Sequence, residues 1–337
     1  MTKVCITVDV ECNIGGAFRD ASLFPVGEQA LWCMVAGRSE GLGFLLETFA
    51  VNQITGTFFL ETMNSHYFKE SPMKKAAERI AGGGHELQLH THPCWSIFKH
   101  ADWRLRCQGQ RHMDDFFGLQ VDAAVALIRE SQSIFQDWQL PVPTVFRSGN
   151  LQHDDSLYQA LSRCGIPYSS SVGLGVFNSG DPGYQLYSGQ HLRHGIVELP
   201  VLSFKEHHLF GKPGVKTLTI TGTSFDETKA LLEDAEKAGL PQVVILTHPF
   251  EFIQKKDSQY SVTRRHAVNQ RRLRKLCQFL AKNRDRFPTV GLATAAREVT
   301  LQTSNRNVAL QTTPCSSGMR NVSNLVYQRF GSLMLNL

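Results

Sequence analysis

The sequence predicts an α/β protein built on a mostly parallel sheet or barrel. Segments with the alternating pattern of strands and segments with helical spacing follow one another along most of the chain. Such alternation is typical of folds in which helices cover parallel strands. Four of the strand segments also end in ionisable residues, as expected for a β/α barrel, whose active site lies at the carboxyl ends of the strands.

Chain length and composition agree with this class. The 337 residues exceed one average domain but suit a single large α/β barrel, and 42% hydrophobic with 19% charged residues indicates a sizeable core. No segment has the apolar length of a membrane span, and the N-terminal residues lack the features of a secretory signal. The 8 cysteines include no CxxC pair, so we expect reduced thiols and a cytoplasmic protein.

The net charge of +5 is mild. Much of the excess lies in a helix predicted over 263–284, in which Leu273, Leu276 and Leu280 form an inner face. We interpret its basic residues as a solvated outer face, and attraction for a phosphorylated or nucleotide-linked substrate is the alternative. Aromatic residues are not interleaved with the basic ones, so no nucleic-acid partner is predicted.

The first half of the chain predicts three strands and two helices. In the first strand, over 3–11, four valine or isoleucine residues alternate with cysteine and polar residues, so the two sets face opposite sides. The segment 13–27 has no clear period and is expected to be a long loop near the site. Helical spacing predicts a helix over 40–53, and Pro near the start with Gly at the end predicts a helix over 71–84. Residues rich in β-branched and aromatic side chains predict a strand over 54–61, and a third strand is expected to end at Pro93.

The second half continues the alternation. Periodicity predicts helices over 122–138, 154–166 (capped by Asp154 or Asp155) and 226–239, and strands over 143–150, 196–204 and 242–248. The segment 169–190 is loop-rich. Residues 299–337 are rich in Ser, Thr, Asn and Gln with little apolar periodicity, so we expect a barrel domain over 1–298 and a poorly ordered polar tail over 299–337.

Two carboxylates end the first strand. Asp9 and Glu11 are two residues apart, so their side chains face the same way, with Cα atoms about 6 to 7 Å apart. Paired carboxylates on a buried face repel each other unless a cation or a donor compensates. A metal ion bound by one would leave the other free as a general base. The plainer alternative is an ion pair with an arginine such as Arg147.

Histidines end the third strand. His90 and His92 share a face by the same period of two, and neutral imidazoles at this spacing suit Zn²⁺ or a similar ion. His85 faces the other way and is interpreted as structural. Cys94 is a soft donor, but its direction cannot be deduced from strand alternation, because it follows Pro93.

Two further strand ends carry single candidates. Arg147 can hold a carboxylate or an oxyanion through a forked hydrogen bond, with a structural salt bridge as the alternative. His248 ends the most apolar strand of the chain. It is predicted to be a general acid, with a hydrogen-bonded core histidine as the alternative.

Taken in order, these residues resemble the motifs of the NodB-type polysaccharide deacetylase family (carbohydrate esterase family 4). "TVDVE" resembles the family's "TFDD", "HTHPC" its "HTxxH", "FRSGN" its arginine motif and "LTHP" its closing "LxxH". The resemblance covers about residues 3–296. It implies a distorted (β/α) barrel of about seven parallel strands and a metal-dependent deacetylase or amidohydrolase that acts on a non-peptide C–N bond.

The chain also departs from the family pattern. Val10 replaces the second aspartate, a metal ligand in many members, and the carboxylate stands at Glu11, as in branches that read Asp-x-Glu. Cys94 stands where the second metal histidine is expected, and His92 is additional. Residues 148–150 replace a proline and an aromatic residue. Either His92 is the third metal ligand, or Cys94 is, or the metal site is weakened, and strand geometry favours His92.

The combined hypothesis is a hydrolase that removes an N-acyl group, such as N-acetyl, from an amino sugar. Glu11, His90 and His92 are expected to bind Zn²⁺, or another divalent ion such as Co²⁺ or Mn²⁺, which would activate a water molecule.

Three further residues complete the hypothesis. Asp9 would accept the proton of the water molecule, Arg147 would orient Asp9, and His248 would protonate the departing amine. A nucleotide- or lipid-linked sugar is the expected substrate. A small amide, ureide or cyclic imide is one alternative, and a catalytically inactive barrel acting as a binding protein is another. The sequence leaves an oligomer open.

Overall fold

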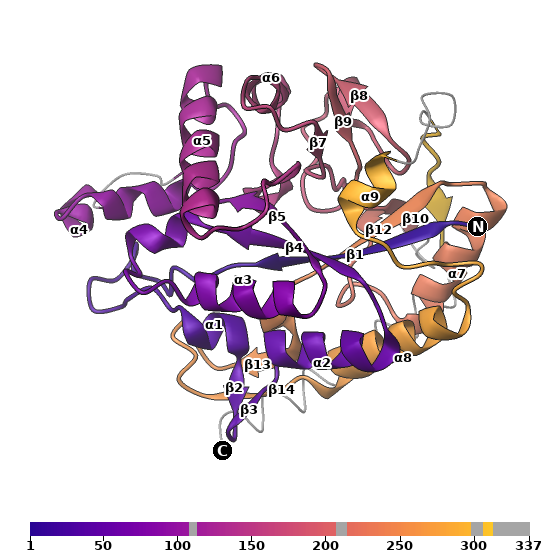
Figure 1. Ribbon diagram of the computed structural model, residues 1–337, viewed down its shortest axis with the longest axis horizontal. Coiled ribbons are helices and arrows are strands. Elements are labelled where there is room, and N and C mark those ends of the chain that lie inside the picture. Colours follow the sequence, from indigo (N-terminus) through magenta and orange to yellow (C-terminus); the bar gives the residue numbers. More distant parts are fainter. Residues whose placement is uncertain (108–112, 207–213, 298–305, 313–337) are drawn as a thin grey trace.

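The computed structural model describes residues 1–107, 113–206, 214–297 and 306–312. Its main element is an eight-stranded sheet that curls into a half-barrel (Figure 1). Seven of the strands run parallel and the last runs antiparallel to its neighbour. The predicted parallel α/β architecture is therefore confirmed. In sheet order, the strands are β12 (Gln242–Thr247), β1 (Lys3–Val10), β4 (Gly56–Glu61), β5 (Glu86–Thr91), β6 (Val145–Ser148), β7 (Tyr168–Ser169), β9 (Ile196–Glu198) and β8 (His191–Arg193).

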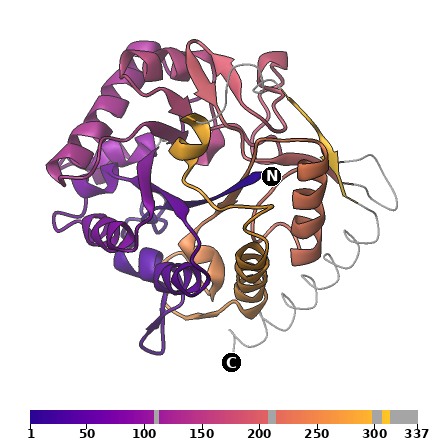
Figure 2. The same cartoon turned by 45° about the vertical axis from the view of Figure 1, so that its right-hand side comes forward.

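Helices surround the central strands (Figure 2). All six predicted helices form, and four of them begin with a side chain that accepts from the backbone of the first turn: Ser71, Asp154, Ser224 and His266. Asp154 caps α6 by accepting from the backbone N–H groups of Ser156 and Leu157, so the cap is Asp154 and not Asp155. The helices are α1 (Glu28–Trp32), α2 (Leu42–Asn52), α3 (Pro72–Gly82), α4 (Trp103–Arg106), α5 (Val121–Asp137), α6 (Asp155–Arg163), α7 (Phe225–Lys237), α8 (Ala267–Lys282) and α9 (Leu292–Arg297).

One predicted strand is wrong. The segment 196–204 forms two strands in different sheets, because Pro200 between them has no N–H for a strand ladder. Its second part belongs to β10 (Ser203–Glu206), which pairs with β11 (Gly214–Thr217) and β15 (Leu310–Gln311). β15 lies in the predicted tail, whose residues 299–305 and 313–337 are outside the described residues. The small hairpins are β2 (Met34–Val35) with β3 (Arg38–Ser39) and β13 (Ile253–Lys255) with β14 (Thr263–Arg265).

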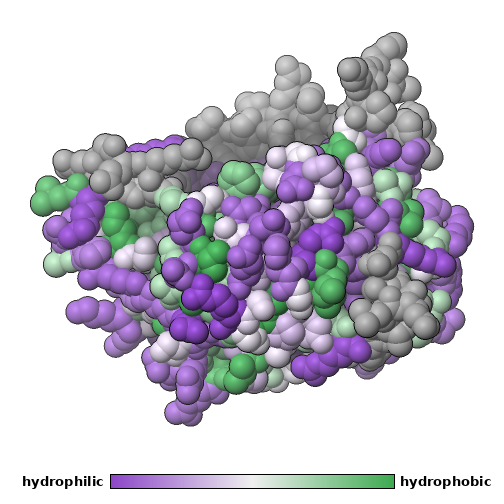
Figure 3. Space-filling view, turned by 90° about the horizontal axis from the view of Figure 1, so that it is seen from above, coloured by the Kyte–Doolittle hydropathy of each residue, from purple (hydrophilic) through white to green (hydrophobic). Residues whose placement is uncertain are grey.

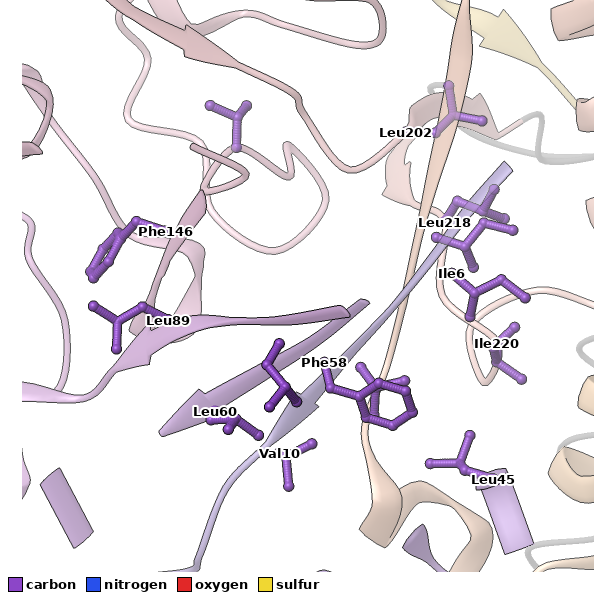
Figure 4. Packing of buried hydrophobic residues seen from close by; sticks show 14 of the residues in the cluster. Ile6, Val10, Leu45, Phe58, Leu60, Leu89, Phe146, Leu202, Leu218 and Ile220 are labelled. Atoms are coloured by element: carbon purple, nitrogen blue, oxygen red, sulfur yellow. The ribbon is translucent and has the colours of Figure 1, made fainter. Parts of the chain in front are cut away.

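The larger core fills the space between the sheet and the helices. The valine and isoleucine residues of β1 contribute to it together with apolar residues of β4, β5, β6 and several helices. Each fully buried side chain of this kind contributes about 1.5–3 kcal/mol. Figure 4 shows part of the cluster: Ile6, Val10, Leu45, Phe58, Leu60, Leu89, Phe146, Leu202, Leu218 and Ile220.

A second, smaller core fills the concave side of the sheet. It contains Cys5 and Phe59, and the short helix α9 closes its amino-terminal end with a leucine and three alanines. The backbone N–H of Leu292 donates to Thr57 Oγ1 over 2.8 Å, and Glu86 accepts from the next N–H. The apolar filling therefore occupies the amino-terminal end, and the polar residues of the strands are left at the carboxyl end.

Short 3₁₀ helices follow the strands at this carboxyl end. They begin at the residue directly after a strand, or within two residues of it, and turn the chain away from the sheet. They are Met63–His66 after β4, Pro93–Lys99 after β5, Gly149–Leu151 after β6 and Pro249–Phe252 after β12; another, Pro182–Tyr184, lies elsewhere. The candidate residues thus lie at abrupt strand ends.

On the face seen in Figure 3, hydrophobic residues are scattered among hydrophilic ones. Among the described residues, no helix combines the length and the apolar character that crossing a membrane requires. The seven cysteines in the described part of the chain are all free thiols, as the prediction of reduced thiols requires.

Candidate active site

Four strands, β12, β1, β5 and β6, carry the candidate residues to one mouth of the half-barrel, and β4 lies between β1 and β5. β12, β1, β4, β5 and β6 are adjacent in the sheet, and their registers align His90 with Arg147 and Asp9 with Phe59. Because parallel strands end at the same edge, residues far apart in the sequence meet there. The structure brings together all six predicted residues: Asp9, Glu11, His90, His92, Arg147 and His248.

Glu11, His90 and His92 form a compact group. A carboxylate oxygen of Glu11 lies 2.9 Å from Nε2 of His92 and 3.7 Å from Nε2 of His90. The two Nε2 atoms are 3.0 Å apart. One potential ligand atom of each residue lies within 4.8 Å of the others, so the three side chains point at a common centre.

The hydrogen bonds behind the rings determine which nitrogens face this centre. Nδ1 of His90 lies 2.9 Å from the carbonyl oxygen of Arg147, and Nδ1 of His92 lies 2.8 Å from Asp114 Oδ1. Both partners can only accept, so each Nδ1 carries the proton and each neutral ring presents a lone pair at Nε2. Two lone pairs and a carboxylate then face one another. This donor set fits a divalent cation such as Zn²⁺.

The electrostatics also favour a positive charge between the rings. Burial alone lowers the pKa of His92, but the carboxylates of Asp114 and Glu11 raise it well above its usual value. Burial alone raises the pKa of Glu11, but the charge of His92 and hydrogen bonds from His90 and His92 lower it well below its usual range. The centre therefore favours a positive charge, which a proton or a divalent ion can supply.

Cys94 lies beside this group but points elsewhere. Its Sγ donates to Asp114 Oδ1 over 2.8 Å. Among the described residues, the compact group contains His92 and not Cys94. The role of His92 as the third ligand stays a prediction, with geometry in its favour.

Arg147 holds Asp9 from inside the sheet. The guanidinium is fully buried, and its Nη1 lies 2.6 Å from Asp9 Oδ1 and 2.9 Å from Thr7 Oγ1. Nε and Nη2 donate to the carbonyl and hydroxyl oxygens of Ser170, each over 2.9 Å, and the ring of Phe59 lies 4.1 Å away. Asp9 is therefore fixed through Oδ1, while its Oδ2 faces His248.

His248 lies across the mouth from the histidine pair. Its Nε2 is 3.9 Å from Asp9 Oδ2 and 4.0 Å from Glu11 Oε1, and its Nδ1 is 3.1 Å from Glu251 Oε1. Burial alone lowers the pKa of His248. The hydrogen bond and charge of Glu251, with the charges of Glu11 and Asp9, raise it to about 9. The imidazole is thus protonated at neutral pH.

Two functional neighbours were missed by sequence reasoning. Glu251 follows His248 by three residues and also accepts from the His248 backbone N–H, the spacing of a capping box, which was a readable signal. Asp114 lies 22 residues after His92 in a loop without a recognisable pattern. His85 packs against the rings of Phe49 and Phe58, in agreement with its structural interpretation.

The loop 13–27 lies beside the site, as its position after the first strand predicted. Together with Ser258, it lines a cleft of about 510 Å³. Cys94 and Asp114 also line the cleft, so it adjoins the histidine group. A ligand in this cleft would lie next to the candidate metal centre.

No family model and no curated protein matches the sequence. Among solved structures, the chain is similar to a putative polysaccharide deacetylase from Mycobacterium smegmatis, with a TM-score of 0.54, 15% identity and coverage of 93% of this chain and 94% of that chain. A second is a mutant of BA3943, a CE4 family pseudoenzyme, with a TM-score of 0.45, 11% identity and coverage of 87% of this chain and 67% of that chain. A third is a family 4 carbohydrate esterase from Streptomyces lividans, with a TM-score of 0.41, 12% identity and coverage of 92% of this chain and 98% of that chain. The first similarity shows that the chain has the polysaccharide deacetylase fold, as the motifs predicted.

Proposed function

We propose that this protein is a metal-dependent hydrolase that removes an N-acyl group, most simply N-acetyl, from an amino sugar. The observation that carries the proposal is the geometry at the mouth of the half-barrel. Three side chains of the kinds that bind metal ions converge there, and an aspartate fixed by a buried arginine faces a protonated histidine. The fold supports the substrate class by analogy with a polysaccharide deacetylase.

Glu11, His90 and His92 would hold the ion, with Zn²⁺, Co²⁺ or Mn²⁺ as candidates. Such an ion acts as a Lewis acid and increases the acidity of water, which makes water a nucleophile near neutral pH. The second nitrogen of each histidine is already hydrogen-bonded, so ring orientation does not have to be established on binding.

The remaining residues would move protons. Asp9 accepts the proton of the attacking water through Oδ2, because Oδ1 is occupied by Arg147. The guanidinium fixes this carboxylate in orientation. His248 starts protonated and faces the same space, so it donates a proton to the departing amine. The carboxylate and the imidazolium thereby act as the base and the acid of one reaction.

The substrate is proposed to be a carbohydrate or a nucleotide- or lipid-linked sugar, bound partly in the cleft formed by the loop 13–27. Amine release from N-acetylated oligosaccharides, nucleotide sugars, small amides, ureides and cyclic imides tests this, with metal-free and Zn²⁺-loaded protein. We expect Zn²⁺-dependent release from an N-acetylated sugar. Release from the small amides, ureides or imides instead would replace the substrate class but keep the chemistry.

Asp9→Asn provides the matched test of mechanism. It is expected to lower kcat by about 10²–10⁴-fold, the range for losing a general base, while binding Zn²⁺ as the wild type does. Asp122→Asn is the control, because Asp122 forms an exposed ion pair with Arg163, which is not one of the candidate residues. The proposal would be contradicted if the wild type bound less than about a tenth of an equivalent of metal and showed no activity on adding Zn²⁺, Co²⁺ or Mn²⁺.

A further inference from the structure

Asp114 accepts hydrogen bonds from three side chains around the candidate metal centre. His92 Nδ1 lies 2.8 Å from its Oδ1, and the Cys94 thiol donates to the same oxygen over 2.8 Å. The amide of Asn150 donates to Oδ2 over 3.1 Å. The donors come from the end of β5, the 3₁₀ helix after it and the 3₁₀ helix after β6. One carboxylate therefore connects two strand ends.

The turn after β6 is shaped to allow this arrangement. A Cβ at Gly149 would lie 2.8 Å from Nδ1 of His92 and 2.5 Å from the carbonyl oxygen of Asp114, so only glycine leaves room for the ring. Asn150 adopts a left-handed conformation with φ of 52°, which asparagine tolerates better than most residues. This conformation directs its amide to Asp114.

We infer that Asp114 is the positioning residue of the metal centre. Its carboxylate accepts a hydrogen bond from Nδ1–H of His92, which directs the Nε2 lone pair at the ion and increases its basicity. Cys94 and Asn150 in turn hold the carboxylate in place. The inference rests on the proposed metal site and adds the residue that sets the affinity of that site.

The same arrangement explains why the chain departs from the family motifs at several positions together. Cys94 is a thiol donor to Asp114 and not a thiolate ligand. Gly149 gives space to the ring of His92, and Asn150 supplies the second donor. These residues form one unit around His92, so a histidine restored at position 94 would remove a donor from Asp114.

Zinc affinity, measured on the purified full chain by competition with a chromophoric chelator, tests the inference. Partners of this kind typically contribute 10–100-fold in metal affinity. Asp114→Asn is expected to bind about 10-fold more weakly and Asp114→Ala up to about 100-fold more weakly, because asparagine keeps an acceptor and alanine does not. Asp122→Asn is the matched control and is expected to bind as the wild type does.

Two readouts separate positioning from misfolding and from ligation by the thiol. The metal-free Asp114 variants are expected to stay folded with a modestly lower unfolding temperature, because hydrogen bonds are lost but the Asp114 side chain is 45% exposed. Cys94→Ser keeps a donor and is expected to retain affinity, and the Co²⁺-loaded wild type is expected to lack a thiolate-to-cobalt absorption band. A strong band, with Cys94→Ser as weak as His92→Ala, would overturn the inference.

The remaining outcomes are distinguishable. If the wild type binds Zn²⁺ through His90 and His92 but Asp114→Ala binds it equally tightly, the inference fails and the metal site stands. If the wild type binds no Zn²⁺, the proposed function and the inference fail together.

Discussion

Arg147 is the residue on which the interior of the site depends. A fully buried guanidinium is tolerated because its donors reach Asp9, Thr7 and Ser170 and its face lies on the ring of Phe59. The sequence left a salt bridge and a catalytic role as alternatives. The structure shows that one ion pair can serve both, since the partner carboxylate is the candidate base.

Breaking this pair is expected to be costly. Arg147→Met would leave Asp9 buried and unpaired, and removing one partner of a buried ion pair typically costs about 3–5 kcal/mol. Urea unfolding measures the loss. Because Asp9→Asn removes the stranded charge, the double variant is expected to be more stable than Arg147→Met alone. A double variant whose losses simply add would contradict this coupling.

His248 and Glu251 predict a pH dependence. The proposed role of His248 as a general acid requires the imidazolium, so activity is expected to fall as pH rises through its pKa, which Glu251 helps to raise to about 9 in the metal-free site. A bound divalent ion opposes this, so the basic limb of kcat/KM is expected at or below pH 9. Glu251→Gln is expected to move the limb lower by about one pH unit.

Glu130→Gln is the control for this shift. Glu130 pairs with His66 over 3.0 Å in the same kind of contact and also with Lys99, and neither partner is one of the six candidate residues. Its variant is expected to leave the pH profile in place. An unmoved limb in Glu251→Gln would show that another group carries the proton.

At the scale of the elements, the abrupt strand ends determine the site, and Gly149 provides the test. Gly149→Ala is expected to displace the ring of His92 and to weaken Zn²⁺ binding at least about 10-fold, the lower range for disturbing a ligand's support. Gly82→Ala is the control, since a Cβ there has nothing within 4 Å and alanine favours helices. Equal zinc affinity in both variants would contradict the close packing at Gly149.

The elements also show what the sequence could predict. Period-two alternation placed Asp9 with Glu11 and His90 with His92, because in-register parallel strands preserve the side on which each residue lies. The segment 196–204 was misjudged because apolar alternation continues across Pro200 although the strand ladder cannot. Asp114 could not be predicted, because its contact with His92 joins two residues that are 22 positions apart and share no periodic pattern.

At the scale of the whole molecule, the half-barrel separates stability from chemistry. The amino-terminal end of its concave side is closed by α9 and apolar residues, and the carboxyl end carries buried polar groups that only hydrogen bonds or a cation satisfy. Filling that end with an ion should therefore stabilise the entire fold. The candidate ligands would connect the ion to this sheet, because Glu11 directly follows β1, and β5 carries His90 and directly precedes His92.

Metal binding is accordingly expected to raise the unfolding temperature. A ligand that binds the folded chain alone at 100 times its Kd adds about 2.7 kcal/mol to the free energy of unfolding, a shift of several degrees for a chain of this size. His90→Ala is expected to abolish the zinc-induced rise. His85→Ala, which removes a ring packed between Phe49 and Phe58, is expected to lower the unfolding temperature but keep the rise. Zinc competes with the proton favoured at His92, so the zinc-induced rise in unfolding temperature is expected to shrink as pH falls. A zinc-induced rise in His90→Ala as large as that in the wild type would show that the ion binds elsewhere.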